Sequence, residues 1–191
     1  MTDETTQKQT VGILAYGSLI SDPRAEIEEA RTDIIPNVMT PFHIEFARSS
    51  TGRGGAPTLV PVTSGGAHVR GQVFVMDVSE AEATDILYRR EIGKVGDMKR
   101  TYKRPEPVTE KSVLVERLTN FAGLDVILYT QIAATIGADQ LVLLKNFIRA
   151  LALRQGRSVT FMPRWTETAD SQSIHLHISM QSGSDSVLRR M

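Results

Sequence analysis

The 191-residue chain contains no cysteine. This absence excludes disulfide bonds, thiolate metal sites and cysteine nucleophiles, and it is typical of a cytoplasmic protein, which is the location that we expect. The sequence also lacks any apolar run near the roughly 20 residues that a membrane-spanning helix needs. The polar first ten residues contain no apolar segment of the kind found in secretory signals. We therefore expect no association with a membrane.

Neither sign of charge is in excess. Lys and Arg together number 22, and Asp and Glu together number 22. Proteins that bind nucleic acid typically carry a basic patch or a strongly basic domain, so we expect no nucleic-acid partner. The hydrophobic fraction of 41% is enough for one ordinary core in a chain of this length. We expect a disordered leader at 1–10, a single domain at 11–180 and a polar tail at 181–191.

Common cofactor and metal motifs are absent as well. The sequence has no G-x-x-x-x-G-K-[ST] loop, and its glycine-rich segment at 52–57 does not satisfy G-x-G-x-x-G. His175 and His177 are two residues apart in a predicted strand and so share one face. A catalytic zinc needs three protein ligands, and no third ligand stands at a recognisable spacing. An exposed polar strand face is therefore favoured over a metal site, and we expect neither a metal nor a cofactor.

Apolar patterning predicts mostly strands with a few separate helices. Helical spacing and capping residues predict helices at 23–31, 80–92 and 138–155. The strands at 58–62 and 69–78 flank a Ser-Gly-Gly turn and are predicted to form a hairpin. This order of elements indicates an α+β fold or a small barrel. Apolar runs or alternation predict strands at 11–16, 42–48, 58–62, 69–78, 112–118, 124–132 and 174–180.

Two short features suggest acid/base chemistry. The first predicted strand stops at Tyr16, Gly17 and Ser18, where backbone N–H groups can point into a cavity. Glu91 lies in the last turn of the predicted helix that ends at Gly93. A buried carboxylate at this position can act as a general base that accepts and returns a proton. The other interpretation is a surface glutamate at a frayed helix end.

Two basic features each allow two interpretations. Arg48 has the same strand parity as Phe42, Ile44 and Phe46, so it leans into the core and needs an anion such as a ligand carboxylate. Alternatively, a bend after the preceding residue turns it into solvent. The segment at 93–107 carries five Lys and Arg residues. Such a run is either a solvated loop or a segment that closes over an acidic substrate.

Several segments resemble the γ-glutamylcyclotransferase-like superfamily. Tyr16–Leu19 is similar to the Y-G-S-[LN] loop that follows the first strand in that family. Residues 46–57 resemble the F-x-x-x-S-T-x-x-R-G-x-x-x-P region of its ChaC branch, although the S-T-D-H-R-G of that branch is reduced here. Residues 69–91 follow the family's order of a strand, a helix and Y-x-x-E, which places the family's catalytic glutamate at Glu91. Residues 126–129 resemble a later strand that brings a tyrosine to the cavity.

The resemblance implies a small mixed β-barrel with peripheral helices and an enzyme without a cofactor. The expected reaction is a transferase- or lyase-type conversion of a small γ-glutamyl amide or peptide, as in glutathione metabolism, to 5-oxoproline and a free amine or peptide. Two alternatives stay open: a non-catalytic domain of the same fold that binds a small carboxylate, and a related cyclotransferase that removes a γ-glutamyl protecting group during biosynthesis. The implied site has Glu91 as general acid/base, and Tyr16, Gly17, Ser18, Leu19, Arg48, Arg53 and Tyr129 as substrate-binding residues.

Overall fold

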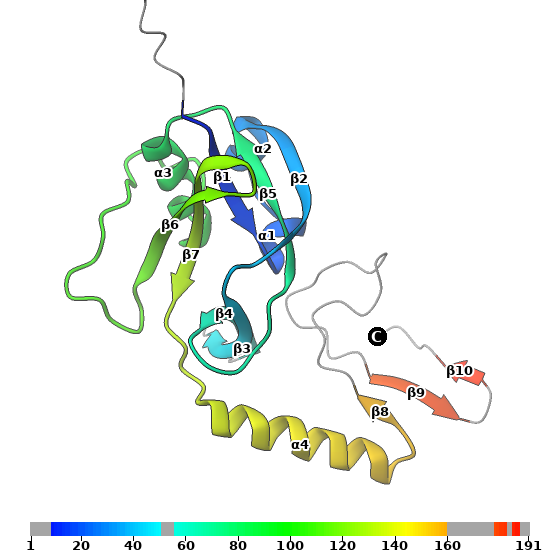
Figure 1. Ribbon diagram of the computed structural model, residues 1–191. Coiled ribbons are helices and arrows are strands. Elements are labelled where there is room, and N and C mark those ends of the chain that lie inside the picture. Colours follow the sequence, from blue (N-terminus) through cyan, green and yellow to red (C-terminus); the bar gives the residue numbers. More distant parts are fainter. Residues whose placement is uncertain (1–8, 51–55, 160–177, 183–184, 188–191) are drawn as a thin grey trace, which may run out of the picture.

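The computed structural model describes residues 9–50, 56–159, 178–182 and 185–187. A sheet-dominated body extends through β7 (Leu124–Ile132), and a long helix follows it (Figure 1). The elements in chain order are β1 (Val11–Ala15), α1 (Ser18–Ser21), α2 (Ala25–Ala30), β2 (Arg31–Met39), β3 (His43–Ser50), β4 (Ala56–Val62), β5 (Arg70–Met76), α3 (Glu80–Glu91), β6 (Val113–Phe121), β7 (Leu124–Ile132), α4 (Ala138–Arg154), β8 (Ser158–Val159), β9 (Ile178–Ser182) and β10 (Asp185–Val187).

The main sheet has five strands in the order β2-β5-β1-β7-β6. Its central strand, β1, is antiparallel to β5 and parallel to β7. All five residues of β1 are buried, as expected for an uninterrupted apolar run covered on both faces. This strand therefore fixes the positions of both its neighbours.

The predicted α+β class is confirmed, because a sheet forms the core and only a few helices cover it. The predicted barrel is wrong: among the described strands, β2 and β6 are the two edges of the main sheet and no pairing joins them. Closure would require such a pairing. The strands β3 and β4 instead form a separate two-stranded sheet, and β8, β9 and β10 form a third.

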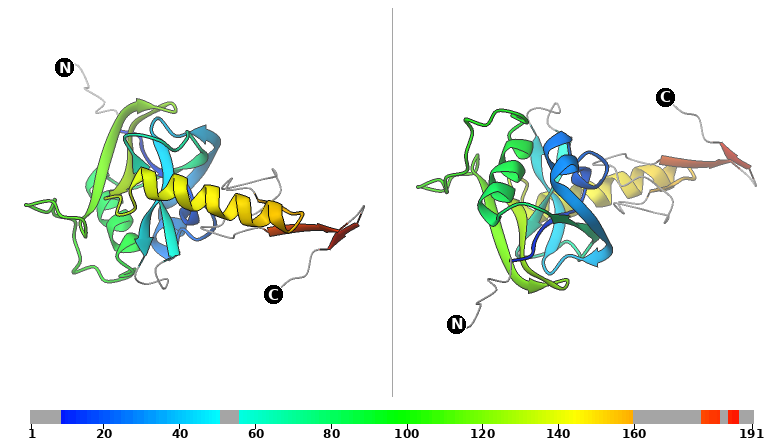
Figure 2. Two further views of the ribbon diagram at one scale, coloured as in Figure 1. Left: turned by 90° about the horizontal axis from the view of Figure 1, so that it is seen from below. Right: turned by 90° about the horizontal axis from the view of Figure 1, so that it is seen from above.

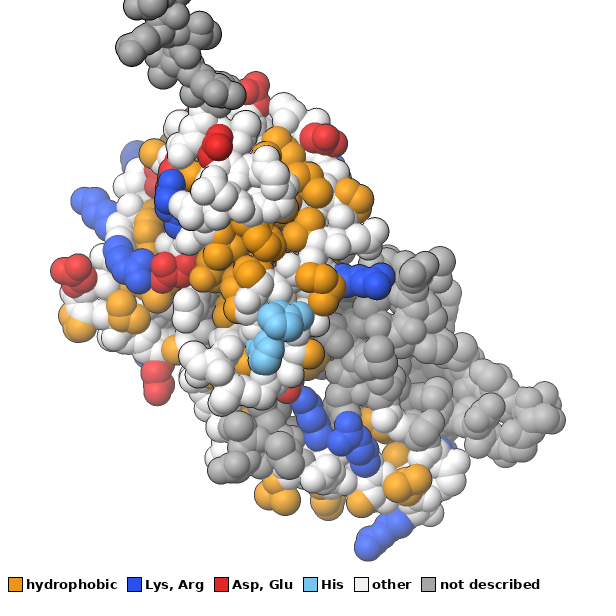
Figure 3. Space-filling view, viewed as in Figure 1, with side chains coloured by type: hydrophobic (Ala, Val, Ile, Leu, Met, Phe, Trp, Pro, Cys, Tyr) orange, Lys and Arg blue, Asp and Glu red, His pale blue; other side chains and the backbone are white. Residues whose placement is uncertain are grey.

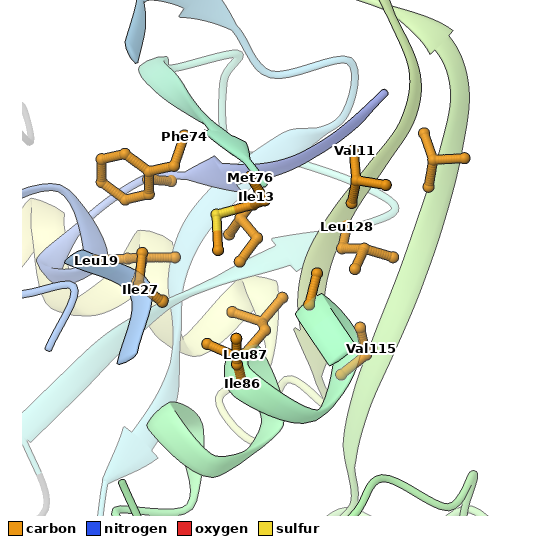
Figure 4. Packing of buried hydrophobic residues seen from close by; sticks show 13 residues of the cluster. Val11, Ile13, Leu19, Ile27, Phe74, Met76, Ile86, Leu87, Val115 and Leu128 are labelled. Atoms are coloured by element: carbon orange, nitrogen blue, oxygen red, sulfur yellow. The ribbon is translucent and has the colours of Figure 1, made fainter. Parts of the chain in front are cut away.

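The helix α3 covers one face of the main sheet. Ala83, Ile86 and Leu87 are buried on the side of α3 that packs against the core, and Figure 4 shows the side chains of Ile86 and Leu87 directed toward the sheet. The predicted helix start is confirmed, since the Ser79 side chain accepts a hydrogen bond from the Glu82 N–H at 3.2 Å. Gly93, with a φ of 66°, ends the helix as predicted.

The opposite face of the sheet has a smaller cluster centred on Leu14, Val73 and Ile127. The Phe42 ring lies against it between two tyrosines: it meets Tyr16 edge-on at 6.0 Å and stacks on Tyr129 at 4.5 Å between ring centroids. In the view of Figure 3, hydrophobic side chains gather over the body, and acidic and basic side chains are spread around them.

The predicted hairpin between 58–62 and 69–78 is wrong. The strand β4 pairs with β3, and β5 lies between β1 and β2. Both sides of β5 are therefore occupied by other strands. The strand β2 was not predicted, because Pro36 and polar residues interrupt its pattern. The structure accommodates Pro36 and Asn37 at an irregularity between Ile35 and Val38, where Asn37 has a φ of 58°.

The helix α4 extends away from the main sheet in both views of Figure 2. The predicted helix at 138–155 is confirmed, with Ala138–Arg154 observed. Helical spacing of apolar residues predicts one buried face for this helix, but Phe147 and Leu151 of that face are exposed. Within the described part of the chain, no helix has the length and apolar character needed to cross a membrane. The predicted strand at 174–180 is observed from Ile178 onward, and 174–177 lie outside the described residues.

Candidate functional site

A small cavity forms where four segments end close together. Because β1 and β7 are parallel neighbours, their C-terminal ends lie side by side. The residues that follow β1 therefore meet the last residues of β7. The C-terminus of α3 and the middle of β4 complete the wall. The cavity has a volume of about 70 Å³ and is lined by Tyr16, Gly17, Ser18, Leu19, Thr58, Leu59, Val60, Pro61, Arg90, Glu91, Thr130 and Ile132.

Five of the eight residues assigned to the site from sequence line this cavity. They are Glu91 and the four residues of the Tyr16–Leu19 loop. More than 70 residues separate the loop from Glu91 in the chain, so their meeting is a result of the fold. Their roles in substrate binding and catalysis stay predictions.

Glu91 is held in place by its neighbour in the chain. Its side chain is 16% exposed, and its Oε1 accepts a hydrogen bond from the Arg90 Nη1 at 2.7 Å. The other donors of Arg90 reach the α1 segment: Nε and Nη2 donate to the Asp22 carbonyl at 3.3 and 2.8 Å, and Nη2 lies 3.5 Å from Ser18 Oγ. Arg90 therefore ties Glu91 to the loop across the cavity. No described residue donates to Glu91 Oε2.

Tyr16 contributes a fixed hydroxyl to the same wall. Its O–H donates to the Thr130 carbonyl at 2.7 Å. Burial raises the pKa of Tyr16 well above its ordinary value, and the negative charge of Glu91 raises it further, while the hydrogen bond to Thr130 opposes these effects. Tyr16 therefore stays protonated at neutral pH and cannot serve as the base. Glu91 is the acidic side chain in the lining.

Three predicted site residues are not placed at this cavity. Arg48 Nη1 donates to the carbonyls of Glu110 at 2.8 Å and Ala133 at 2.7 Å. These backbone oxygens take the place of the ligand carboxylate that the sequence suggested as its partner. Tyr129 stacks on Phe42 instead of lining the cavity, because strand alternation puts it on the opposite face from Thr130. Arg53 lies outside the described residues.

The other sequence-based candidates also lie elsewhere. The segment at 93–107 contributes no residue to the lining of this cavity; instead Tyr102 packs against Tyr88 of α3, and its N–H donates to Asp85. His175 and His177 lie outside the described residues. Within the described ranges, no group of three or more His, Cys, Asp or Glu side chains is placed to hold a metal ion.

Thr58 and Arg90 are site residues that sequence reasoning missed. The Thr58 Oγ1 atom is buried and has no hydrogen-bond partner among the described residues. Its segment was read as one arm of a hairpin with 69–78, which concealed its position beside β7. Arg90 was considered only as a positive charge that could fold back toward Glu91 and was not assigned to the site. Pairing β1 with β7 from the sequence would have placed the end of β7 beside the Tyr16–Leu19 loop and so located this side of the cavity.

A larger cavity adjoins the first. Its volume is about 580 Å³, and Pro61 and Ile132 line both cavities. An ion pair crosses its wall from α4 to β3, with Lys145 Nζ and Glu45 Oε2 2.7 Å apart. The connecting segment from Ala133 to Gly137 forms another side. Space for a larger molecule is therefore available next to the Glu91 cavity.

Comparison with family models shows that residues 126–189 are similar to the catalytic domain of glutamine synthetase. The match covers about a third of the chain and begins within β7, the strand that brings Thr130 and Ile132 to the cavity. Comparison with curated proteins found no match, and comparison with solved structures found none either.

The match overturns the family resemblance and the function inferred from it. Glutamine synthetase is a different family from the γ-glutamylcyclotransferase-like superfamily, so the predicted cyclotransferase, lyase and 5-oxoproline chemistry is wrong. The alternatives on the same scaffold receive no support either. The motifs were each only a few residues long, and a strand–turn or a helix ending in glutamate arises in many α+β folds. The expectation of an enzyme is retained at the coarser level, because the matched model is a catalytic domain.

Proposed function

We propose that the protein is a ligase that joins a carboxylate to an amine, and that the cavity around Glu91 is its acid/base site. One observation carries the proposal. The segment that is similar to a ligase catalytic domain enters the cavity through β7 and there meets a largely buried carboxylate.

This reaction needs an activated acid and a base. A nucleoside triphosphate transfers its terminal phosphoryl group to a carboxylate oxygen, which gives an acyl phosphate and a nucleoside diphosphate. The amine nitrogen then forms a bond to the acyl carbon, and the bond from that carbon to the phosphate oxygen breaks. The nitrogen loses one proton, which Glu91 accepts. The products are the amide, phosphate and the nucleoside diphosphate.

The lining of the cavity suits the step in which the amine loses its proton. Glu91 Oε1 is engaged by Arg90, which fixes the carboxylate, and among the described residues Oε2 has no donor, so it is assigned the proton. Tyr16 stays protonated and anchored on Thr130, so it shapes the wall without competing as a base. The volume of about 70 Å³ is less than half that of an engineered cavity of roughly 150 Å³ that binds benzene. The cavity therefore accepts only the small reacting group.

Phosphoryl transfer is commonly assisted by divalent metal ions. The described residues do not fit such an ion, because no three candidate ligands among them come together. We therefore assign no step to a metal and place the chemistry of the chain at Glu91.

The ligase proposal is tested by assaying amide formation. Each reaction contains the protein, ATP, one amine (methylamine or ammonium) and one acid from a panel of amino acids and simple carboxylic acids. We expect phosphate release that requires both the acid and the amine, with the amide detected by mass spectrometry. Replacement Glu91→Gln should lower kcat by about 100-fold or more, since general base catalysis typically contributes that much.

A matched control is the Glu29→Gln variant, which changes an exposed glutamate of α2 away from the cavity and should keep the wild-type rate. If no acid and amine pair is joined under these conditions, the ligase proposal is wrong. If joining occurs and Glu91→Gln retains the wild-type rate, the assignment of the base is wrong.

A further inference from the structure

The starting observation is the unpaired hydroxyl of Thr58. This residue lies on β4 and lines the cavity that contains Glu91, and its Oγ1 has no partner among the described residues. Buried polar atoms are almost always hydrogen-bonded, so an exception in a cavity wall points to a missing partner. Oγ1 is itself inaccessible to solvent, so rotation about χ1 to another staggered position must exchange it with the methyl group to turn the hydroxyl toward the cavity. A group that enters the cavity can therefore supply the partner.

The charges around the cavity define what that group is. Glu91 and Arg90 form an ion pair, with side chains that are 16% and 12% exposed, so the wall is close to neutral overall. A bound carboxylate would face Glu91 with a charge of the same sign, and a bound ammonium group would add an unpaired positive charge beside Arg90. Either would be an uncompensated charge in a site largely shielded from water. A neutral polar group avoids both penalties.

The hydrogen-bonding groups of the cavity wall further restrict which neutral polar groups can bind. Glu91 Oε2 only accepts hydrogen bonds, whereas the Thr58 hydroxyl can donate one. The entering group must therefore combine an N–H donor with an oxygen acceptor a few bond lengths apart. The small volume of about 70 Å³ limits it to a few heavy atoms. A primary carboxamide meets all of these requirements.

We propose that the cavity is a binding site for a neutral primary carboxamide group, whose N–H donates to Glu91 Oε2 while its carbonyl oxygen accepts from the Thr58 hydroxyl. The relevance of this site to catalysis rests on the proposed ligase function, for which such a group is the product formed with ammonia. The binding itself does not depend on that function and can be measured separately.

The test uses three probes of matched size: propionamide, propionate and propylammonium. Each is titrated into the 191-residue protein, and amide chemical shifts of the Tyr16–Leu19 loop are followed by NMR. We expect propionamide to bind with a Kd lower than those of the two charged probes by about tenfold or more, because a like charge or an unpaired charge is costly in such a site.

Three variants assign the contacts. Thr58→Val should raise the Kd for propionamide by about tenfold, the value of one lost hydrogen bond, and Thr58→Ser should bind as the wild type does. Glu91→Gln should reverse the preference in favour of propionate, because Arg90 is then left without its partner. The control Thr119→Val removes a hydroxyl from an exposed position on β6 and should leave all three Kd values unchanged.

The inference is overturned if propionate binds the wild-type protein as tightly as propionamide, if none of the probes shifts the loop signals, or if Thr58→Val binds propionamide as the wild type does. The comparison among the three probes on the wild type holds even where a variant does not fold. If propionamide binds as expected while no acid and amine pair is joined, the ligase proposal fails and the carboxamide site stands.

Discussion

Thr58 places an energetic cost within the cavity wall. Its buried hydroxyl loses its hydrogen bonds to water and gains none from the part of the chain that the structure describes, which costs about 1–3 kcal/mol in protein mutational data. The chain carries this cost in the absence of a ligand. Sites with such costs are commonly functional, because stability and binding make different demands on the same residue.

The same reasoning predicts the stability of a variant. Thr58→Val keeps the shape of the side chain and removes the unpaired hydroxyl, so we expect the free energy of unfolding of the free protein to rise by about 1 kcal/mol. Urea unfolding at pH 7 measures this change. Thr58→Ser, which keeps the hydroxyl, should show no such gain. A loss of stability in Thr58→Val would mean that the hydroxyl has a partner in solution.

The residues of the cavity differ in how visible they are in the sequence. Glu91 and Tyr16 were found because each stands where a regular element stops, and capping residues mark such points. Thr58 stands within a strand, where nothing in the local pattern separates it from its neighbours, and Arg90 precedes Glu91 in the last turn of α3. Only the pairing of distant strands reveals that they share a cavity.

Among the elements, β5 makes an unusually close approach to β1. A Cβ atom added at Gly71 would overlap the Ala15 carbonyl oxygen at the end of β1 and would lie 3.7 Å from the Val38 oxygen of β2. Glycine is therefore required for backbone proximity here. The contact also supports the point at which β1 leads into the Tyr16–Leu19 loop.

Gly71→Ala should consequently strain the sheet next to the cavity. We expect the free energy of unfolding to fall by about 2–3 kcal/mol, as for overpacked positions elsewhere, with a lower melting temperature measured by calorimetry. Gly137→Ala is the control, since Gly137 has a φ of −64° and its added Cβ would come no closer than 3.9 Å to a heavy atom. Equal effects of the two substitutions would contradict a steric role for Gly71.

Elements were predictable from sequence where local signals agreed. The helix α3 has a capping serine, a buried face and a terminating glycine, and its bounds were predicted closely. The strand β2 has a proline and polar residues in its middle, and it is the long-range pairing with β5 that stabilises it. Its omission left β5 with a free side, which was then assigned to β4. The false hairpin follows from this missing strand, whereas the barrel was implied by the family resemblance.

At the scale of the whole molecule, a buried ion pair joins α2, α3 and the segment that follows α3. Arg89 of α3 binds Glu26 of α2 through Nε at 3.1 and 2.8 Å, and its Nη1 donates to the Arg100 carbonyl at 3.2 Å. Glu26 also accepts from the Gly96 N–H. Both side chains are largely buried, at 5% and 11% exposed. Removal of one partner would leave an uncompensated charge in the interior.

Acid should weaken the fold through this pair. Burial acts to raise the pKa of Glu26, but the hydrogen bonds from Arg89 and Gly96, with the charge of Arg89, outweigh it and hold the pKa below its ordinary value of 4.5. A lowered pKa in the folded state gives stability that is present above the ordinary value and is lost as the pH falls through the folded pKa. We therefore expect stability to decline below about pH 4.5.

Urea unfolding between pH 3 and pH 7 tests this expectation. Glu26→Gln should flatten the acid limb of the stability profile, and Arg89→Met should cost about 3–5 kcal/mol at pH 7 because Glu26 is then buried without its partner. The exposed Glu29→Gln variant should reproduce the wild-type profile. An unchanged acid limb in Glu26→Gln would show that other carboxylates control acid unfolding.

The parallel pairing of β1 with β7 has a consequence for synthesis in the cell. Val11 of β1 pairs with Val126 of β7, so β1 leaves the ribosome well before β7 and waits for it before its apolar side chains are fully enclosed. Until then the nascent chain exposes an aggregation-prone edge. Chaperone binding during translation is thus expected to concentrate on β1 and to end once β7 has emerged.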